Sequence, residues 1–448
     1  MKKVALINPG RNKEFADNEP LNLGYLASFL LANKIDVKII DQFAGDDVDK
    51  LLKEYNPDFV GITATTPLAD EAYKILDGAK KKGFVTVIGG VHASIMSEEA
   101  LRHADYVVVG EGERALLDIV FSKSKTRIVK GPLIENIDDI PPPSRSLLKM
   151  KFYSAKSGNT PTAHLYFLPP GKKLASMITS RGCPYSCIFC HNSWRGLKVR
   201  YNTPKRVVNE ILELVKGYQI NSIFFMDDDL FFNSNRIKQI CSLILENKID
   251  IIWAANARVT SVNPEILELA KKAGLRQVNF GIESGSQRVL DIIDKKVTVE
   301  QSEKALKMVK EAGLLVYATF MIGNPTETLE DMNKTREFIK KNSLDSVGIG
   351  ITTPYPGTKL WEWCKEKKLI PETYAWKDFD MESCPVAGNE NYSRKDIEKI
   401  RSKMVVDIML GKKFGFMLYY LKLMFISPPQ FFGKLFRIVM PLLGLRRK

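Results

Sequence analysis

Short, continuous apolar runs recur along the first 110 residues, and helix-length segments separate them. The runs cover residues 3–8, 37–40, 59–63, 85–88 and 106–109. Strands that are apolar throughout, with no alternation of polar residues, are typical of parallel sheets buried on both faces. The pattern therefore predicts an α/β fold that begins with a doubly wound parallel-sheet domain over residues 1–125, with its ligand site beyond the carboxyl ends of the strands.

A second series of strand and helix patterns begins at Leu174, after a stretch rich in breakers. Asp138-Asp-Ile-Pro-Pro-Pro-Ser predicts a domain linker over residues 126–172. The helices of the second series have clear starts, such as Thr203 before Pro204 and the capping-box pair Thr298 and Gln301. Six repeats predict a partial (β/α)6 barrel of the TIM type over residues 173–370, with chemistry at the carboxyl ends of its strands. The expected strands are 174–179, 221–226, 250–254, 276–281, 314–321 and 345–351.

The last segment, residues 371–448, is expected to be helical and ends in an apolar tail. Two apolar blocks follow Lys413, separated by Pro428-Pro429 and interrupted by Lys422, Lys434 and Arg437. Neither block reaches the roughly 20 uninterrupted apolar residues that span a bilayer. Basic residues beside aromatic and leucine residues favour a helix lying on the inner membrane surface, and the alternative is a helical cap on the barrel.

Composition and charge narrow the possible partners. The chain has 448 residues, 45% of them hydrophobic, and a formal net charge of +14. Such a charge suits nucleic acid, an anionic membrane surface or anionic cofactors. No RNA-binding module or groove of aromatic and basic residues is visible, so nucleic acid is not expected as a partner. No signal peptide precedes the first strand, which predicts a reducing cytoplasmic location.

Three cysteines lie within one short loop after the first strand of the predicted barrel. Cys183, Cys187 and Cys190 have the spacing C-x3-C-x2-C. Three thiolates so spaced can ligate three irons of a cubane cluster and leave the fourth iron open for a substrate or cofactor. The alternatives are a structural zinc site and cysteines buried as small apolar residues. Cys241, Cys364 and Cys384 form no second pair for zinc, and His191 is too close to Cys190 for easy tetrahedral closure.

This loop resembles the signature of the radical S-adenosylmethionine (radical SAM) enzymes. The resemblance implies a [4Fe-4S] cluster whose open iron is chelated by the amino and carboxylate groups of S-adenosylmethionine, which is then cleaved to a 5'-deoxyadenosyl radical. It also implies that Phe189 lies near the adenine. The strand ends match the family in order, and they comprise Asp227 to Asp229, Arg258, Gly281 with Glu283 and Ser284, and Gly323.

The resemblance assigns a role to each of these strand ends. Asp228 is expected to meet the amino group of S-adenosylmethionine, and Arg258 suits its carboxylate. Glu283 and Ser284 are expected near the ribose and carboxylate, while Gly323 permits close approach of the backbone. For Asp227 to Asp229, capping of the next helix is the alternative.

The first domain carries glycines where its ligand should bind. Gly89 and Gly90 precede His92, and Gly110 and Glu111 follow the next strand. With residues 20–27, these motifs resemble a cobalamin-binding domain and imply cobalamin as a cofactor; tight turns without a ligand are the alternative. None of the four histidines has an aspartate two residues before it, so the D-x-H-x-x-G cobalt-ligand motif is absent. Any cobalamin should therefore bind without a histidine ligand.

Together these features predict a cobalamin-dependent radical SAM enzyme that works under anaerobic conditions with a reductant such as ferredoxin or flavodoxin. We expect a methyltransferase acting on an unactivated carbon of a small hydrophobic, lipid-like or isoprenoid-like substrate. The alternatives are a radical cyclase or oxidative C–C bond-forming enzyme resembling the tetrapyrrole cyclases and, in another class, a nucleic-acid-modifying protein. A methylthiotransferase should carry a second cysteine triad near its N-terminus, but no cysteine precedes Cys183.

Overall fold

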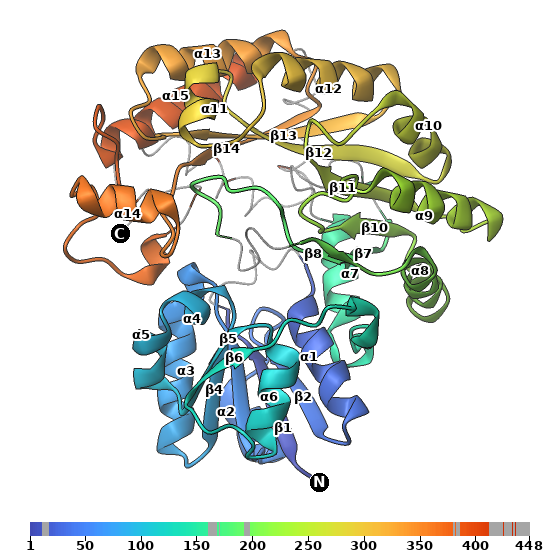
Figure 1. Cartoon of the computed structure of the whole chain (residues 1–448), viewed down its shortest axis with the longest axis vertical. Helices are drawn as coiled ribbons and strands as arrows, with labels where there is room; N and C mark the ends of the chain where they lie inside the picture. Colours follow the sequence, from blue (N-terminus) through green and yellow to red (C-terminus); the bar gives the residue numbers. More distant parts are fainter. Residues whose placement is uncertain are drawn as a thin grey trace.

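The computed structural model contains two parallel sheets, each covered by helices (Figure 1). It describes residues 1–10, 18–159, 168, 169, 171–191, 198–379, 381 and 386–411, together with Met424, Phe432 and Leu435. The first sheet and its helices form the lower unit in Figure 1, and the second sheet curves above it. The apolar tail blocks of the sequence lie outside the described residues apart from those three positions. No helix in the described part is both long and apolar enough to cross a membrane.

The first sheet has six parallel strands in the order β2-β1-β3-β4-β5-β6. Alternate side chains of β1 face opposite layers: Val4 and Leu6 belong to the core beneath α1 and α6, and Ala5 and Ile7 to the core beneath α2 and α3. This two-sided burial confirms the predicted doubly wound sheet. Its strands are β1 (Lys3–Asn8), β2 (Asp36–Asp41), β3 (Phe59–Thr63), β4 (Val85–Gly89), β5 (Tyr106–Gly110) and β6 (Ile128–Gly131). Its helices are α1 (Leu21–Ala32), α2 (Val48–Tyr55), α3 (Ala69–Lys81), α4 (Val91–Ile95), α5 (Ser97–His103) and α6 (Gly112–Val120).

The sixth strand lies in the segment that the sequence predicted as a linker. β6 is an edge strand of four residues, none of them fully buried, so it carries too weak an apolar signal to be recognised. The first sheet thus extends beyond the boundary expected near residue 125. The same segment also forms helix α7 (Met150–Asn159) and two 3-10 turns, η3 (Ile137–Asp139) and η4 (Arg145–Leu147).

The second sheet also has six parallel strands, in the order β14-β13-β12-β11-β10-β7, and confirms the open partial barrel. Thr203 and Asn263 cap their helices through side-chain hydrogen bonds, and Thr298 and Gln301 form the predicted capping box. The strands are β7 (Leu174–Met177), β10 (Ser222–Phe225), β11 (Ile252–Ala257), β12 (Leu275–Glu283), β13 (Leu315–Ile322) and β14 (Ser346–Ile351). The helices are α8 (Pro204–Tyr218), α9 (Ser234–Glu246), α10 (Pro264–Lys272), α11 (Gln287–Ile292), α12 (Val299–Glu311), α13 (Leu329–Lys341), α14 (Lys359–Glu366) and α15 (Arg394–Gly411).

A buried arginine joins the two sheets. Arg145, between the domains in sequence, donates to Glu19 at 2.8 Å and to Glu210 of α8 at 2.7 Å. It also donates to the carbonyl oxygen of Ser176 in β7 at 2.8 Å. All three charged side chains are at most 6% exposed. A buried charge is tolerated only with such partners, so this triad fixes the first domain beside one edge of the barrel.

A second attachment lies at the other end of the barrel. The indole of Trp376, in η6 (Trp376–Asp378), donates to Glu99 of α5 at 2.7 Å. The backbone N–H of Lys377 donates to Asp70 of α3 at 3.2 Å. The first domain is therefore held at both sides of the barrel opening.

The turn after β13 contains a buried carboxylate. Glu327 accepts hydrogen bonds from the backbone N–H groups of Gly323 (2.6 Å) and Asn324 (2.9 Å). Burial raises its pKa from the ordinary 4.5 to about 7, although these hydrogen bonds oppose the shift. The folded protein consequently binds a proton here more tightly than the unfolded chain does.

This carboxylate predicts a pH dependence of stability. Because the folded pKa is raised, the free energy of unfolding should fall as pH increases from about 4.5 to about 7. Glu327→Gln should remove that loss, so the variant should gain on the order of 1 to 3 kcal/mol relative to wild type between pH 5 and pH 8. Chemical denaturation at both pH values measures this gain. Glu330→Gln, on the exposed face of α13, is the control, and parallel pH profiles for Glu327→Gln and wild type would contradict the assignment.

Candidate functional site

A cavity of about 530 Å³ lies where the carboxyl ends of the first sheet meet the barrel. Gly89, Gly90 and Gly110 line it from the first domain, and Cys190 and Asp228 line it from the second. The carboxyl ends of strands from both sheets therefore face one cavity. Apolar residues form much of the remaining wall, among them Leu6, Leu23, Leu26, Ile62, Val87, Val108, Leu116 and Ile178.

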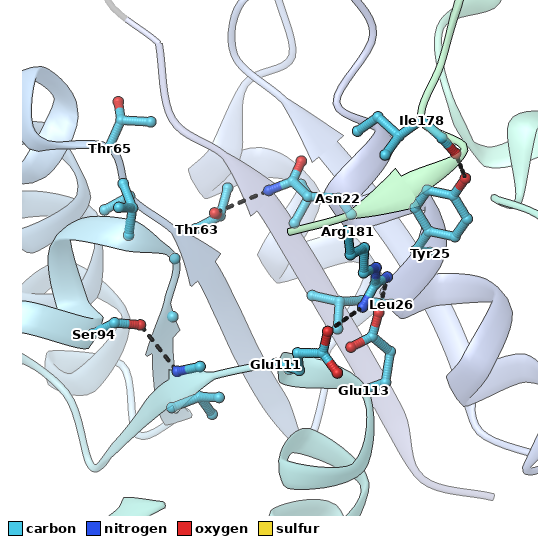
Figure 2. Close-up of a pocket in the computed structure, with 18 of the residues that line it drawn as sticks. Asn22, Tyr25, Leu26, Thr63, Thr65, Ser94, Glu111, Glu113, Ile178 and Arg181 are labelled. Carbon is cyan, nitrogen blue, oxygen red and sulfur yellow. Dashed lines mark hydrogen bonds and ion pairs between the residues drawn. The ribbon is translucent and has the colours of Figure 1, made fainter. Parts of the chain in front are cut away.

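Figure 2 shows how polar groups are distributed along this cavity. Asn22 of α1 donates to the hydroxyl of Thr63 at 3.0 Å, and the hydroxyl of Ser94 accepts from the backbone N–H of Gly110 at 3.1 Å (Figure 2). Thr65 lines the cavity on the same side as Thr63 (Figure 2). These uncharged groups suit a ligand that presents amides or hydroxyls together with a large apolar surface.

The glycines at the strand ends also form tight turns. Gly90 has a φ of 93°, and a Cβ there would lie 2.8 Å from the Thr63 hydroxyl and 2.9 Å from the backbone of Ala64. No other residue fits that position without displacing the turn after β3. A role in tight turns and a role in lining a ligand site are thus compatible for these glycines, because the turns themselves line the cavity.

His92 does not reach the cavity, contrary to its predicted cofactor contact. Its side chain is fully buried, and its Nε2 lies 3.0 Å from the hydroxyl of Tyr73. The ring meets Trp376 edge-on, with centroids 4.7 Å apart. The first turn of α4 points this side chain toward α3 and the second attachment, so the structure gives His92 a role in domain contact.

Glu111 is both a cavity residue and the centre of an ion-pair network. It accepts from Arg200 at 2.8 Å, from Arg181 at 3.2 Å and from the N–H of Ile134 at 2.8 Å. Glu113 also pairs with Arg181 (Figure 2). Burial alone would raise the pKa of Glu111, but these hydrogen bonds and positive charges hold it below its usual value.

The two arginines of this network flank the cysteine loop in sequence. Arg181 belongs to β8 (Ser180–Arg181), which pairs antiparallel with β9 (Arg200–Tyr201). The network therefore fixes the base of the loop to the first domain. Sequence reasoning missed both arginines, because two-residue strands give no periodic signal.

The three cysteines have the donor set that a cubane cluster needs. Cys187 is buried, and Cys183 and Cys190 are partly exposed, with Cys190 in the cavity wall. Burial, together with the negative charges of Asp228 and of the other two cysteines, raises the pKa of the Cys190 thiol to about 12. Binding to iron removes this penalty, since the metal charge stabilises thiolates. The loop therefore fits a cluster held by one cysteine per iron.

Two of the other three cysteines lie in the described part of the chain, and both are buried. Cys241 is 1% exposed inside α9, as expected for a core residue, and Cys364 is 2% exposed inside α14. Cys384 lies outside the described residues.

The three aspartates after β10 have different environments. Asp227 is buried and accepts from Ser180 and from the backbone N–H and hydroxyl of Thr179, so it supports the start of the cysteine loop. Asp228 is exposed in the cavity, where its charge reaches Cys183 and Cys190. Burial raises the pKa of Asp229 to about 6. The capping alternative is wrong for these aspartates, because Asn233 caps α9.

Arg258 and Glu283 lie beside the cysteine loop and have partners of their own. The guanidinium of Arg258 stacks on the Tyr185 ring, 3.6 Å from its centroid, and donates to the carbonyl oxygen of Lys295. Glu283 accepts from the Lys295 ammonium at 2.8 Å. Both predicted residues thus lie near the cysteine loop, and Lys295 is an additional residue there that the sequence did not identify.

Two other predicted residues have structural contacts that do not support their predicted roles. Ser284 is fully buried, and its hydroxyl lies 3.0 Å from that of Thr335 in α13. Gly323 has a φ of 81°, and a Cβ there would lie 2.8 Å from the side chain of Ile397 in α15. These residues join strand ends to the outer helices.

Comparisons with known proteins agree with this architecture. The family model of the radical SAM superfamily matches residues 177–339, and that of the B12-binding domain matches residues 13–120. An uncharacterised methyltransferase of Pyrococcus horikoshii is 36% identical, with 88% of each chain covered. The anaerobic magnesium-protoporphyrin IX monomethyl ester cyclase of Rubrivivax gelatinosus is 29% identical over 82% of this chain and 70% of its own.

A solved structure shares the fold of the whole chain. The cobalamin-dependent S-adenosylmethionine radical enzyme OxsB superimposes with a TM-score of 0.74 at 17% identity, covering 98% of this chain and 72% of its own. Fold, cysteine loop and family matches together define a radical SAM enzyme. The chain belongs to the branch of that family with an N-terminal cobalamin-binding domain, whose cofactors are a [4Fe-4S] cluster, S-adenosylmethionine and cobalamin.

The cysteine loop generates a direct prediction. Cys183→Ala, Cys187→Ala and Cys190→Ala should each lose the visible absorbance and most of the iron of the reconstituted protein, and all should fail to release 5'-deoxyadenosine. Cys241→Ala should retain both properties, because that thiol is enclosed in the core of α9. Iron analysis and product chromatography under anaerobic conditions provide the measurements. Release of 5'-deoxyadenosine by a triple alanine variant of the loop would refute the assignment.

Proposed function

We propose that this enzyme transfers a methyl group to an unactivated carbon of a hydrophobic substrate. The observation that carries the proposal is the shared cavity: its walls include the strand ends of the cobalamin-binding domain and also Cys190 and Asp228 of the radical SAM domain. When bound, the cluster with S-adenosylmethionine supplies a carbon radical, and cobalamin supplies a methyl group. One shared space can therefore present a substrate carbon to both cofactors.

The side chains around this space have separable tasks. The three cysteines hold the cluster, and Asp228 offers a carboxylate in the cavity for the ammonium group of S-adenosylmethionine. Glu111 and Glu113 are neutralised by Arg181 and Arg200, so they add little net charge to the wall. The apolar lining excludes water, which limits side reactions of a radical.

The same lining supports a hydrophobic substrate. Apolar side chains of both domains reach the cavity, including Leu26 and Val108 from the first and Ile178 and Met226 from the second. A lipid-like or isoprenoid-like molecule would be favoured there by removal of its apolar surface from water. Radical cyclisation is the second candidate, because the cyclase of Rubrivivax gelatinosus is similar in sequence over most of this chain.

Isotope labelling distinguishes the two reactions. Reconstituted enzyme with cobalamin, a reductant and S-adenosylmethionine deuterated in its methyl group should add one labelled methyl to a component of an organic-solvent extract of cells. Mass spectrometry should show replacement of one hydrogen by that methyl, with none in the Cys190→Ala control. Unlabelled loss of two hydrogens would instead identify ring closure or oxidation.

The basic, apolar tail supports a location at a membrane surface. Anionic headgroups attract basic segments by about 1 kcal/mol for each Lys or Arg near the surface. The full-length protein should co-sediment with anionic liposomes, and truncation after Lys412 should abolish binding. Full-length protein with Lys422, Lys434 and Arg437 changed to glutamate should also stay in the supernatant. Equal sedimentation of all forms, or of none, would contradict the membrane role.

A further inference from the structure

A buried ion pair beside the cysteine loop joins Glu283, a residue expected from the sequence, to Lys295, which the sequence did not identify. The ammonium of Lys295, after α11, lies 2.8 Å from the carboxylate of Glu283 at the end of β12. The two side chains are 11% and 10% exposed. A pair withdrawn from water to this degree interacts more strongly with neighbouring charges than a surface pair does.

The backbone is shaped around this pair. Glu283 adopts a φ of 69°, which is uncommon for a residue with a side chain, at an irregularity in the pairing of β12 with β13. Gly281 provides the space, since a Cβ there would lie 2.5 Å from the Glu283 carboxylate and 3.2 Å from the Lys295 ammonium. Strain of this kind persists only where surrounding contacts impose it, and it is concentrated at functional sites.

The segment that carries Lys295 contacts the cysteine loop repeatedly. The carbonyl oxygen of Ile293 accepts from the N–H of Ile188 at 3.1 Å, and Asp294 accepts from the Ser186 hydroxyl at 3.0 Å. The Lys295 ammonium lies 5.9 Å from the centroid of the Phe189 ring. Residues 293–295 thus hold the loop from Ser186 to Phe189, on both sides of Cys187.

The positive charge of Lys295 lies beside the segment that leads into Cys190, because its ammonium faces the ring of Phe189, the residue before that cysteine. The reduction potential of an iron–sulfur cluster depends on nearby charge and hydrogen bonding. A cation beside the ligand loop favours the cluster after it accepts an electron, because the cluster then carries one more negative charge.

We propose that Lys295, oriented by Glu283, is a positioning residue that raises the reduction potential of the cluster. When a ferredoxin-like or flavodoxin-like donor supplies one electron to the cluster, the Lys295 ammonium would compensate the added negative charge. Glu283 limits this effect and keeps the ammonium beside the Phe189 ring. The pair would thereby adjust how readily the cluster is reduced before it cleaves S-adenosylmethionine.

The test is a redox titration of the reconstituted full-length protein, followed by electron paramagnetic resonance in the absence of S-adenosylmethionine. At the wild-type midpoint potential, Lys295→Met should lower the reduced fraction from one half to about one tenth. The ratio of reduced to oxidised cluster then falls about tenfold, which for a one-electron couple corresponds to a midpoint shift of about 59 mV to lower potential. Lys295→Arg should titrate as wild type does. The matched control is Lys296→Met, because Lys296 is 72% exposed and already paired with Asp294.

The variant Glu283→Gln is an independent test, in which the midpoint potential should shift in the opposite direction. Removing the carboxylate leaves the Lys295 charge less compensated, so the midpoint should rise. Lys295→Met protein with full iron content and an unchanged midpoint would overturn the proposal. If Lys295→Met fails to hold a cluster, Glu283→Gln decides: a higher midpoint supports the proposal, and an unchanged or lower midpoint overturns it.

Discussion

The contact between two arginines and two carboxylates determines where chemistry can occur in this protein. Arg181 and Arg200 flank the cysteine loop, while Glu111 and Glu113 belong to the loop and helix that follow β5. Because all four groups are largely buried, each depends on the others for compensation of its charge. The interaction therefore sets the distance between the cluster loop and the strand ends of the cobalamin-binding domain. The shared cavity follows from this constraint.

The sequence predicted most of the elements, because their signals are local. Fully apolar strands and capped helices need no knowledge of the tertiary structure, and Thr203 and Thr298 cap as expected. The missed elements are short or partly exposed. β6 has four residues and β8 and β9 have two each, so their existence depends on partners that are distant in sequence.

The site was less predictable, since identical residue types have different tasks. Asp227 and Asp228 are neighbours, but one supports the cysteine loop from inside and the other faces the cavity. His92 and Ser284 stand in motifs that suggest ligand contact, but local geometry turns both toward neighbouring helices. Lys295 carries no motif, and only the fold brings it beside Phe189. A sequence motif therefore identifies the residue type but does not specify the direction in which its side chain points.

The triad of Glu19, Arg145 and Glu210 has a consequence for the history of such proteins. Its members lie in the first domain, the connecting segment and the barrel, at separations of 126 and 65 residues. A shuffled gene that joined this first domain to a foreign barrel would inherit an arginine and a glutamate without their third partner. An uncompensated charge would then remain inside the junction. Recombination at this boundary is therefore constrained, and the three coding segments are expected to be inherited as one unit.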